Sequence, residues 1–323
     1  MAKAPGRSDR TGITLKQLLR RFPDNDAAEK WLVKQRWPSG VCCPECGSLN
    51  VQQRPKHPTM KFRCREKACP TQFFSTKTGT VMEGSKVGYQ DWLIATFLVM
   101  TSLKGVSSMK LHRDIGVTQK TAWFLAQRLR AAMIANGSPF SGPVEVDETY
   151  FGGKEQHKHE SKKLKAGRGA VGKTAVVGAK DRATKKVAAK VVASTDKPTL
   201  HGFVKEHAAP GAKVYTDDAR AYSALPFDHA VVKHSLKEYV RGDVHTNGIE
   251  SLWSMLKRAH KGTFHKLSPK HLDRYVQEFA GRHNARDLDT IDQIAEVASG
   301  MQGKRLKYKA LVADNGLPSG ARS

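Results

Sequence analysis

All five cysteines of this 323-residue chain fall within one short segment, residues 42–69. Four of them form two pairs, with two and four intervening residues, and seventeen residues separate the pairs: Cys43, Cys46, Cys64 and Cys69. These spacings are typical of a zinc ribbon, in which four thiolates hold a tetrahedral ion and a hairpin joins the pairs. We therefore predict a structural Zn²⁺ site, with Cys42 as a spare thiol or as a replacement for Cys43. A ribbon that has lost its metal, or inert buried cysteines, are the competing interpretations.

The charge of the chain indicates its partner. The 55 Lys and Arg residues outnumber the 30 Asp and Glu residues and give a formal net charge of +25. Such a charge attracts polyanions, and nucleic acid is the commonest of them. An anionic membrane is a weaker alternative, because the longest nearly apolar run, residues 92–100, is far shorter than the roughly 20 residues that cross a bilayer. The first ten residues are polar and contain no apolar signal-peptide core. We expect a cytoplasmic, nucleoid-associated protein that does not span a membrane.

Helical periodicity precedes and follows the cysteine segment. Apolar residues recur at helical spacing over residues 13–37, where Pro23 and the polar residues after it interrupt the pattern, so we predict two short helices. A longer helical stretch extends from about residue 89 to residue 133. Within it we predict three helices, at residues 92–103, 107–114 and 118–133.

The last two of these helices have the arrangement of a helix-turn-helix. The turn between them, residues 115–117, is short and contains a glycine, as in many DNA-binding helix pairs. We predict that the second helix contacts DNA through Lys120 and Arg128. A plain helical bundle is the alternative, because the aromatic residues Trp123 and Phe124 must face a core.

Beyond residue 140 the pattern changes to short apolar runs typical of β-strands. We predict three strands, a helix, a strand, a short helical segment, a strand and a long helix, at residues 144–151, 174–180, 187–193, 198–207, 213–216, 219–224, 230–234 and 246–260. This is the order of elements in the ribonuclease H-like fold, a mixed sheet flanked by helices.

Acidic side chains recur on neighbouring elements of this predicted sheet. Glu145 and Asp147 share one face of the first strand because side chains alternate along a strand, and Glu148 points to the other face. Asp217 ends the fourth strand, which is adjacent to the first in the ribonuclease H-like order, and Glu250 lies on the last helix. Three carboxylates in this arrangement suit a pair of Mg²⁺ or Mn²⁺ ions, which stabilise the attacking and leaving oxygens of phosphoryl transfer.

Basic and amide side chains accompany the acids. Asn247, Glu250 and Lys257 share one face of the last helix, so Lys257 is placed to hold a DNA phosphate beside the metal ions. A Gly- and Lys-rich insertion over residues 154–173 is predicted to clamp phosphates, with a solvated linker as the alternative. The remaining predicted DNA contacts are Lys154, Lys162, Lys163, Arg168 and Arg258.

Several segments together resemble the DDE transposases of bacterial insertion sequences, in the group with an N-terminal zinc ribbon. The resemblance covers roughly residues 40–290 and rests on CPECG, TGTVMEGSK, GVTQKTAW, VEVDETYFGGKE, TDDARAY, HTNGIESLWSMLKR and HLDRYVQEFAGRHNAR. It implies that Asp147 and Asp217 are the first two catalytic acids and that Lys257 is their basic partner. Glu250 is the implied third acid, and Asn247 is its rival for that place.

The resemblance implies an enzyme that cuts DNA at the terminal inverted repeats of an insertion sequence and joins the freed 3′-hydroxyl to target DNA. Because two DNA ends must be held together, a homo-oligomer is expected. No small-molecule substrate is expected. A zinc-ribbon DNA-binding regulator with an inactive catalytic fold, and a metal-dependent nuclease without strand joining, are the alternative functions.

The complete prediction is a multidomain chain of the α+β and α/β classes. Its parts are an N-terminal helical segment over 1–39, the zinc ribbon over 40–80, a helix-turn-helix-like domain over 81–138, a ribonuclease H-like catalytic domain over 139–290, and a C-terminal helix with a disordered tail over 291–323. The C-terminal helix is predicted to pack on the catalytic domain or to serve oligomerisation.

Overall fold

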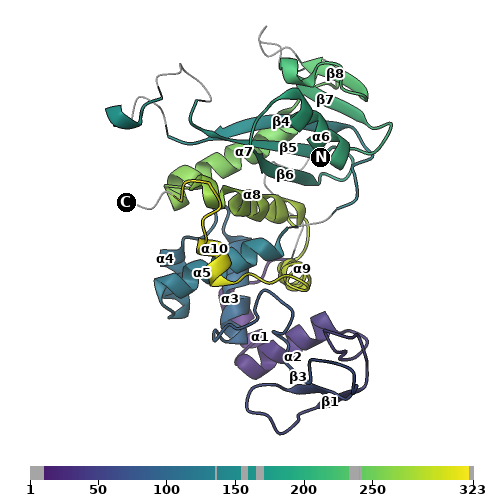
Figure 1. Cartoon of the computed structure of the whole chain (residues 1–323), viewed down its shortest axis with the longest axis vertical. Helices are drawn as coiled ribbons and strands as arrows, with labels where there is room; N and C mark the ends of the chain where they lie inside the picture. The colour runs from purple at the N-terminus through teal and green to yellow at the C-terminus, as the bar shows by residue number, and fades with distance from the viewer. Residues whose placement is uncertain are drawn as a thin grey trace. The chain divides into compact units, whose positions relative to one another are not determined.

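The computed structural model describes residues 11–134, 137–153, 159–164, 171–232, 240 and 242–319 (Figure 1). The chain divides into two compact units, residues 1–134 with 285–313 and residues 135–284 with 314–323. Three predicted DNA contacts lie outside the described part: Lys154, Arg168 and the side chain of Lys162. Within the described part, the helices fall short of the length and apolar content that a membrane span requires.

The first unit begins with the two short helices that the sequence predicted. Helix α1 (Leu15–Arg21) starts after Thr14, whose side chain accepts the backbone N–H of Gln17. Helix α2 (Asn25–Arg36) starts after Asp24, whose carboxylate accepts the backbone N–H of Ala27. Each cap satisfies a backbone donor that the first turn of a helix leaves unpaired, which explains why two helices form here rather than one.

A small antiparallel sheet follows, with strands β1 (Val51–Gln53), β2 (Phe62–Cys64) and β3 (Phe73–Phe74) in that order. The predicted hairpin between the two cysteine pairs is therefore present. Trp37, at the end of α2, packs edge-on against Phe62 and Phe74, with ring centroids 5.6 and 6.1 Å apart. These three aromatic rings form one small core with Cys43, Cys64 and Cys69, which also includes Val33 of α2.

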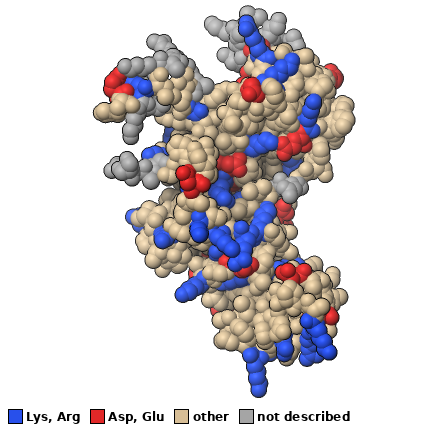
Figure 2. All heavy atoms as spheres, viewed as in Figure 1, with Lys and Arg blue, Asp and Glu red and all other residues tan. Residues whose placement is uncertain are grey.

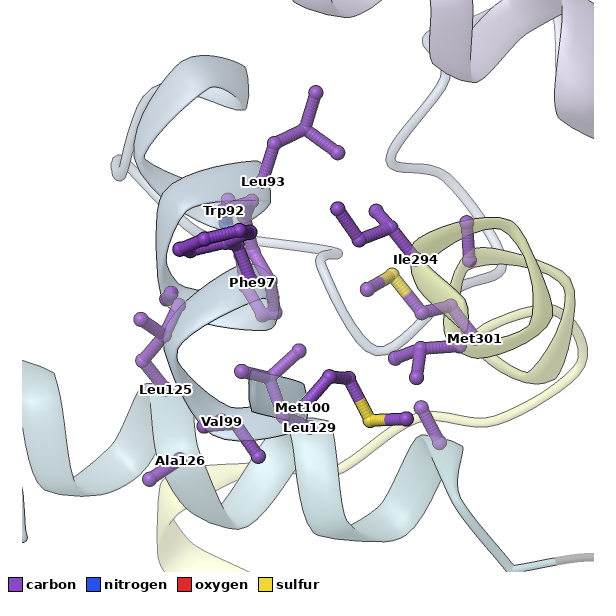
Figure 3. Close-up of a cluster of buried hydrophobic side chains, with 14 of the residues drawn as sticks. Trp92, Leu93, Phe97, Val99, Met100, Leu125, Ala126, Leu129, Ile294 and Met301 are labelled. Atoms are coloured by element: carbon purple, nitrogen blue, oxygen red, sulfur yellow. The ribbon is translucent and has the colours of Figure 1, made fainter. Parts of the chain in front are cut away.

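The rest of the first unit is a helical core built around α3. Its helices are α3 (Tyr89–Thr101), α4 (Ser108–Ile115), α5 (Gln119–Ala132), α9 (Thr290–Gly300) and α10 (Tyr308–Val312). Helix α3 is apolar on nearly all sides because it is covered from several directions. Figure 3 shows Trp92 and Met100 of α3 with Leu129 of α5, and with Ile294 and Met301 at the C-terminal end of the chain.

Helix α9 completes this core, since Ile294 and Val297 are almost fully buried in it. The prediction that the C-terminal helix packs on the catalytic domain is therefore wrong, whereas its role in oligomerisation stays a prediction. Its apolar face is occupied within the first unit. Local periodicity predicted the helix and its apolar face, but it contained no information on which distant segment that face would cover.

The position of Arg128 corrects its prediction as a DNA contact. The side chain is buried, its Nη2 donates to the Glu83 carbonyl at 3.0 Å, and its Nε donates to the Leu306 carbonyl at 3.3 Å. The guanidinium also lies over the Phe124 ring. Because these partners satisfy the guanidinium, the side chain can be buried, and its charge alone was not enough to predict a surface position. Lys120, in contrast, is exposed on the first turn of α5.

The second unit contains a five-stranded mixed sheet in the order β6-β5-β4-β7-β8. The strands are β4 (Val144–Phe151), β5 (Thr174–Asp181), β6 (Val187–Val192), β7 (Lys213–Asp217) and β8 (Asp228–Val232). Strands β4, β5 and β6 are antiparallel neighbours, whereas β4, β7 and β8 are parallel. Glu145 pairs with Tyr215 in the register of β4 and β7, so the predicted adjacency of the first and fourth strands is confirmed.

Helices cover both faces of this sheet, as predicted. The helical segments are α6 (Lys197–His207), the 3₁₀ turn η3 (Arg220–Tyr222), α7 (Asn247–Ala259), the π-helical turn η5 (His260–Phe264) and α8 (Pro269–Asn284). One face packs on α6 and η3 through Leu200, Phe203 and Tyr222. The other packs on α7 and α8 through apolar residues that include Ile249 and Val276. The acids of β4 therefore lie between two cores.

Candidate catalytic site and zinc centre

The four predicted zinc ligands meet in the first unit. Their sulfur atoms all lie within 4.8 Å of one another. The Sγ atoms of Cys43 and Cys69 are 3.7 Å apart, and those of Cys46 and Cys64 are also 3.7 Å apart. A tetrahedral ion with Zn–S bonds of about 2.3 Å requires sulfur–sulfur distances of about 3.8 Å, so the cysteines fit zinc. The group does not include Cys42, although it is adjacent to Cys43.

Burial raises the pKa of the Cys69 thiol to about 12. This thiol therefore keeps its proton at neutral pH when no cation is near. Zinc binds thiolates and releases their protons, which makes the ion part of the folded ribbon rather than an addition to it.

The predicted catalytic acids gather around Asp147 in the second unit. Burial, and after it the negative charges of Glu148, Asp217 and Glu250, together raise the pKa of Asp147 to about 7. These charges come from β4, the end of β7 and the first turn of α7. The fold thus brings together the three acids predicted from sequence, and it adds Glu148.

Trp253 holds the carboxylate of Asp147, and sequence reasoning did not find this contact. The indole Nε1 of Trp253 donates to Asp147 Oδ2 at 3.0 Å. The indole reaches this position because Gly178 on β5 leaves room for it. A Cβ atom at Gly178 would lie 2.6 Å from the Trp253 ring. The contact also shows that Asp147 faces α7.

Glu148 lies on the other face of β4, as the alternation of side chains predicted, yet it belongs to the same group of charges. The hydroxyl of Tyr222 donates to Glu148 Oε2 at 2.8 Å. Burial raises the pKa of Glu148, the hydrogen bond from Tyr222 lowers it, and the charge of Asp217 raises it again. Alternation along β4 predicted the direction of the Glu148 side chain, but not that its charge would act on Asp147 from the opposite face of the strand.

The two candidates for the third acid have different surroundings. Glu250 is half-buried, accepts a hydrogen bond from Thr246 Oγ1 at 2.8 Å, and its charge acts on Asp147. Asn247, three residues earlier on the same helix, is exposed. This arrangement favours Glu250. Further along α7, Lys257 and Arg258 are exposed, and the Nε of Arg258 donates to the Ser254 carbonyl at 3.2 Å.

The chemistry of these donors fits a hard divalent cation, because carboxylate oxygens are the ligands that Mg²⁺ and Mn²⁺ prefer. Among the residues that the structure describes, the cysteines form the single set of three or more potential ligands whose atoms all lie within 4.8 Å. The carboxylates around Asp147 are not part of that set. They repel one another through a partly buried region, and a cation among them would remove that repulsion.

Lys163 belongs to the Lys-rich insertion over residues 154–173 that was predicted to bind phosphates, and its side chain is within the part that the structure describes. Its Nζ lies 2.6 Å from Glu160 Oε2, so part of its charge is neutralised within the insertion itself. The binding of phosphates by this insertion stays a prediction.

The raised pKa of Asp147 leads to a prediction about stability. Below about pH 4 this carboxyl is protonated in both the folded and the unfolded chain. Between about pH 4 and pH 7 only the unfolded chain loses the proton, so the free energy of unfolding falls as the pH rises, and above pH 7 the loss is complete. We expect Asp147→Asn to raise the free energy of unfolding by roughly 2 kcal/mol at pH 8 and by little at pH 4.

This prediction can be measured by urea denaturation of the zinc-loaded protein without Mg²⁺ or Mn²⁺. Asp228→Asn is the matched control, because the Asp228 side chain on β8 is 66% exposed. It should change the free energy of unfolding by less than about 0.5 kcal/mol at either pH. Equal responses of the two variants at pH 8 would contradict the prediction.

Comparison with known proteins bears on both sites. A model of the ISXO2-like transposase domain matches residues 139–284, and a model of the transposase zinc-ribbon domain matches residues 23–72. The carboxylates around Asp147 lie within the first matched range, and the four clustered cysteines lie within the second. A transposase domain implies the ribonuclease H-like fold, and the five-stranded mixed sheet has the order of elements expected for it.

Relatives were found over most of the chain. It is 30% identical over 284 residues to an uncharacterized protein in transposable element ISH50 of Halobacterium salinarum, which covers 81% of this chain and 91% of that protein. It is 30% identical over 106 residues to an uncharacterized transposase-like protein of Haemophilus influenzae, covering 32% of this chain and 85% of that protein. A chain in the cryo-EM structure of the simian T-cell lymphotropic virus intasome in complex with PP2A regulatory subunit B56 gamma aligns at 15% identity, over 58% of this chain and 65% of that chain. Its TM-score is 0.27, so this alignment has no bearing on the fold.

Proposed function

The chain belongs to the family of transposases with an ISXO2-like transposase domain and a zinc ribbon, and we propose that it cleaves the ends of an insertion sequence and joins the freed 3′-hydroxyl to target DNA. The observation that supports this proposal best is the group of carboxylates around Asp147. Repulsion among these carboxylates lowers the stability of the folded chain, and phosphoryl transfer with divalent cations is a reaction that needs such a group.

Asp147, Asp217 and Glu250 are the residues that we propose hold Mg²⁺ or Mn²⁺. When bound, the cations lower the pKa of water and stabilise the oxygens that attack and leave the phosphate. Trp253 fixes the orientation of Asp147, and Thr246 fixes that of Glu250. Oriented carboxylates lose little freedom when a cation binds, which favours a defined geometry over a loosely held ion.

The proposed DNA substrate is attracted by the positive charge of the chain. Figure 2 shows Lys and Arg side chains on both units, with several projecting from the surface around the zinc ribbon. Lys257 and Arg258 of α7 follow Glu250 and are exposed, and we propose that they bind phosphates next to the acids. Lys120 on α5 and Lys163 are further proposed contacts. We propose that the ribbon over 40–80 and the helical part over 81–138 bind the terminal inverted repeats, while residues 139–290 carry out the chemistry on a homo-oligomer that pairs two ends.

A cleavage and joining assay tests this function. Purified protein is incubated with a labelled DNA fragment that carries the terminal repeat of the element, a target plasmid, and Mg²⁺. We expect strand cleavage at the end of the repeat and a labelled product joined to the plasmid. A fragment with a scrambled repeat and a reaction without divalent cation are the controls. Cleavage without a joined product would indicate a nuclease, and binding without cleavage would indicate a regulator.

A further inference from the structure

Glu145 is a second buried acid of β4, two residues before Asp147, and it is 2% exposed. A carboxylate in such a position needs partners for both oxygens. Its Oε1 accepts a hydrogen bond from Arg182 Nε at 2.7 Å, and its Oε2 accepts one from the backbone N–H of Ile249 at 3.0 Å. Ile249 is in the first turn of α7, directly before Glu250. The carboxylate of Glu145 therefore caps the helix that carries the proposed third acid.

Arg182 connects this carboxylate to the segment that leads into α7. The residue directly follows β5, and its two terminal nitrogens donate to the backbone carbonyls of Asp243 and His245, the latter at 2.8 Å. The guanidinium lies over the ring of Tyr215 on β7, 4.5 Å from its centroid. One side chain thus joins the central strands of the sheet to residues 243–245 through several planar contacts, which a lysine could not reproduce.

Gly248 allows the first turn of α7 to approach this pair. A Cβ atom at position 248 would lie 2.5 Å from Glu145 Oε2 and 2.9 Å from Lys180 Nζ. The same lysine donates to the Gly248 carbonyl at 3.3 Å. Because the carboxylate of Glu145 is held by two hydrogen bonds, it cannot move aside for a methyl group as an exposed side chain would. The close approach of helix and sheet therefore depends on glycine at this position.

We propose that Glu145 and Arg182 form a clamp that positions residues 243–250, and so sets the place of Glu250 relative to Asp147. Their contacts reach the chain on both sides of Thr246, which itself donates to Glu250. Neither clamp residue is proposed to touch a cation or DNA. The inference rests on the proposed function in one respect, since it assigns Glu250 to the metal site of that function.

Mn²⁺ binding to the purified, zinc-loaded protein tests the clamp directly. Arg182→Lys keeps the positive charge but loses the planar set of contacts, and Gly248→Ala displaces the same turn without removing a charge. We expect each variant to weaken Mn²⁺ binding, measured by electron paramagnetic resonance, by roughly 10-fold or more, the usual effect of removing a residue that orients a metal ligand. Strand cleavage should require a correspondingly higher Mn²⁺ concentration.

The matched control is another buried ion pair of the same unit, Arg282 and Glu278 of α8, whose charged atoms are 3.5 Å apart. Arg282→Lys should lower the unfolding temperature without changing Mn²⁺ affinity. If Arg182→Lys behaves like this control, with lower stability and unchanged Mn²⁺ affinity, the clamp has no positioning role. Wild-type protein that binds no Mn²⁺ would also overturn the inference. Wild-type protein that binds Mn²⁺ but does not cleave DNA would contradict the proposed function alone, because Mn²⁺ affinity still reports on the clamp.

Discussion

Asp147→Asn is expected to reduce strand cleavage by at least roughly 10²–10³-fold, the usual loss when one stabiliser of a charged transition state is removed. The amide keeps an oxygen that can accept the hydrogen bond from Trp253, so the geometry of the site is preserved while its negative charge is lost. Asp217→Asn should have the same effect, because both acids are proposed to hold the cations.

Binding to the terminal repeat should change by less than about 3-fold, since phosphate contacts come mainly from basic side chains. The measurement is a paired assay of cleavage and binding on one labelled substrate, with Asp228→Asn as the control that keeps both. The gain in stability predicted for Asp147→Asn strengthens the test, because lost cleavage could not then be attributed to unfolding. Cleavage at a wild-type rate by either variant would contradict the assignment of the metal site.

Loss of zinc is expected to unfold the ribbon. Its sheet has three strands of two or three residues, and its core contains few side chains besides Trp37, Phe62 and Phe74. A module this small cannot bury enough apolar surface to fold alone, whereas a structural zinc ion supplies on the order of 10 kcal/mol. Cys64→Ser should therefore abolish zinc binding and the protease resistance of the ribbon, and weaken binding to the terminal repeat.

Cys42→Ser is the matched control for this experiment. Cys42 is adjacent to a proposed ligand but outside the cluster of four, so the variant should keep its zinc. Zinc content is measured by mass spectrometry, and the ribbon by limited proteolysis. A Cys64→Ser protein with an intact ribbon and normal DNA binding would show that the metal is dispensable. Zinc loss in Cys42→Ser would instead show that this thiol serves as a ligand.

Sequence alone predicted those features of the fold that depend on local patterns. The alternation in residues 144–151 corresponds to β4, and the turn at 115–117 separates α4 from α5. Helix α8 was not among the predicted elements, although Leu272, Val276 and Phe279 recur at helical spacing and could have indicated it. The adjacency of the first and fourth strands followed from the order of elements, because few sheet topologies accommodate that order.

The contacts of the acids could not be predicted in this way, because they join residues far apart in the chain. Trp253 and Asp147 are 106 residues apart, and Ile249 and Glu145 are 104 apart. Patterns of charge and polarity identify side chains that need partners, but not which partners the fold supplies. Arg128 illustrates the same limit, since its carbonyl partners come from residues 83 and 306.

Helix α9 has a consequence for the order in which the protein forms on the ribosome. The first unit consists of residues 1–134 and 285–313, so the whole of residues 135–284 is synthesised before α9 appears. At about 5–20 residues per second, that takes on the order of 10–30 s. During this interval Leu93 and Met100 of α3 have no Ile294 or Met301 to cover them. The part of the chain that is made first is therefore completed last, and newly made protein passes through a stage in which the side of α3 that α9 later covers has no partner.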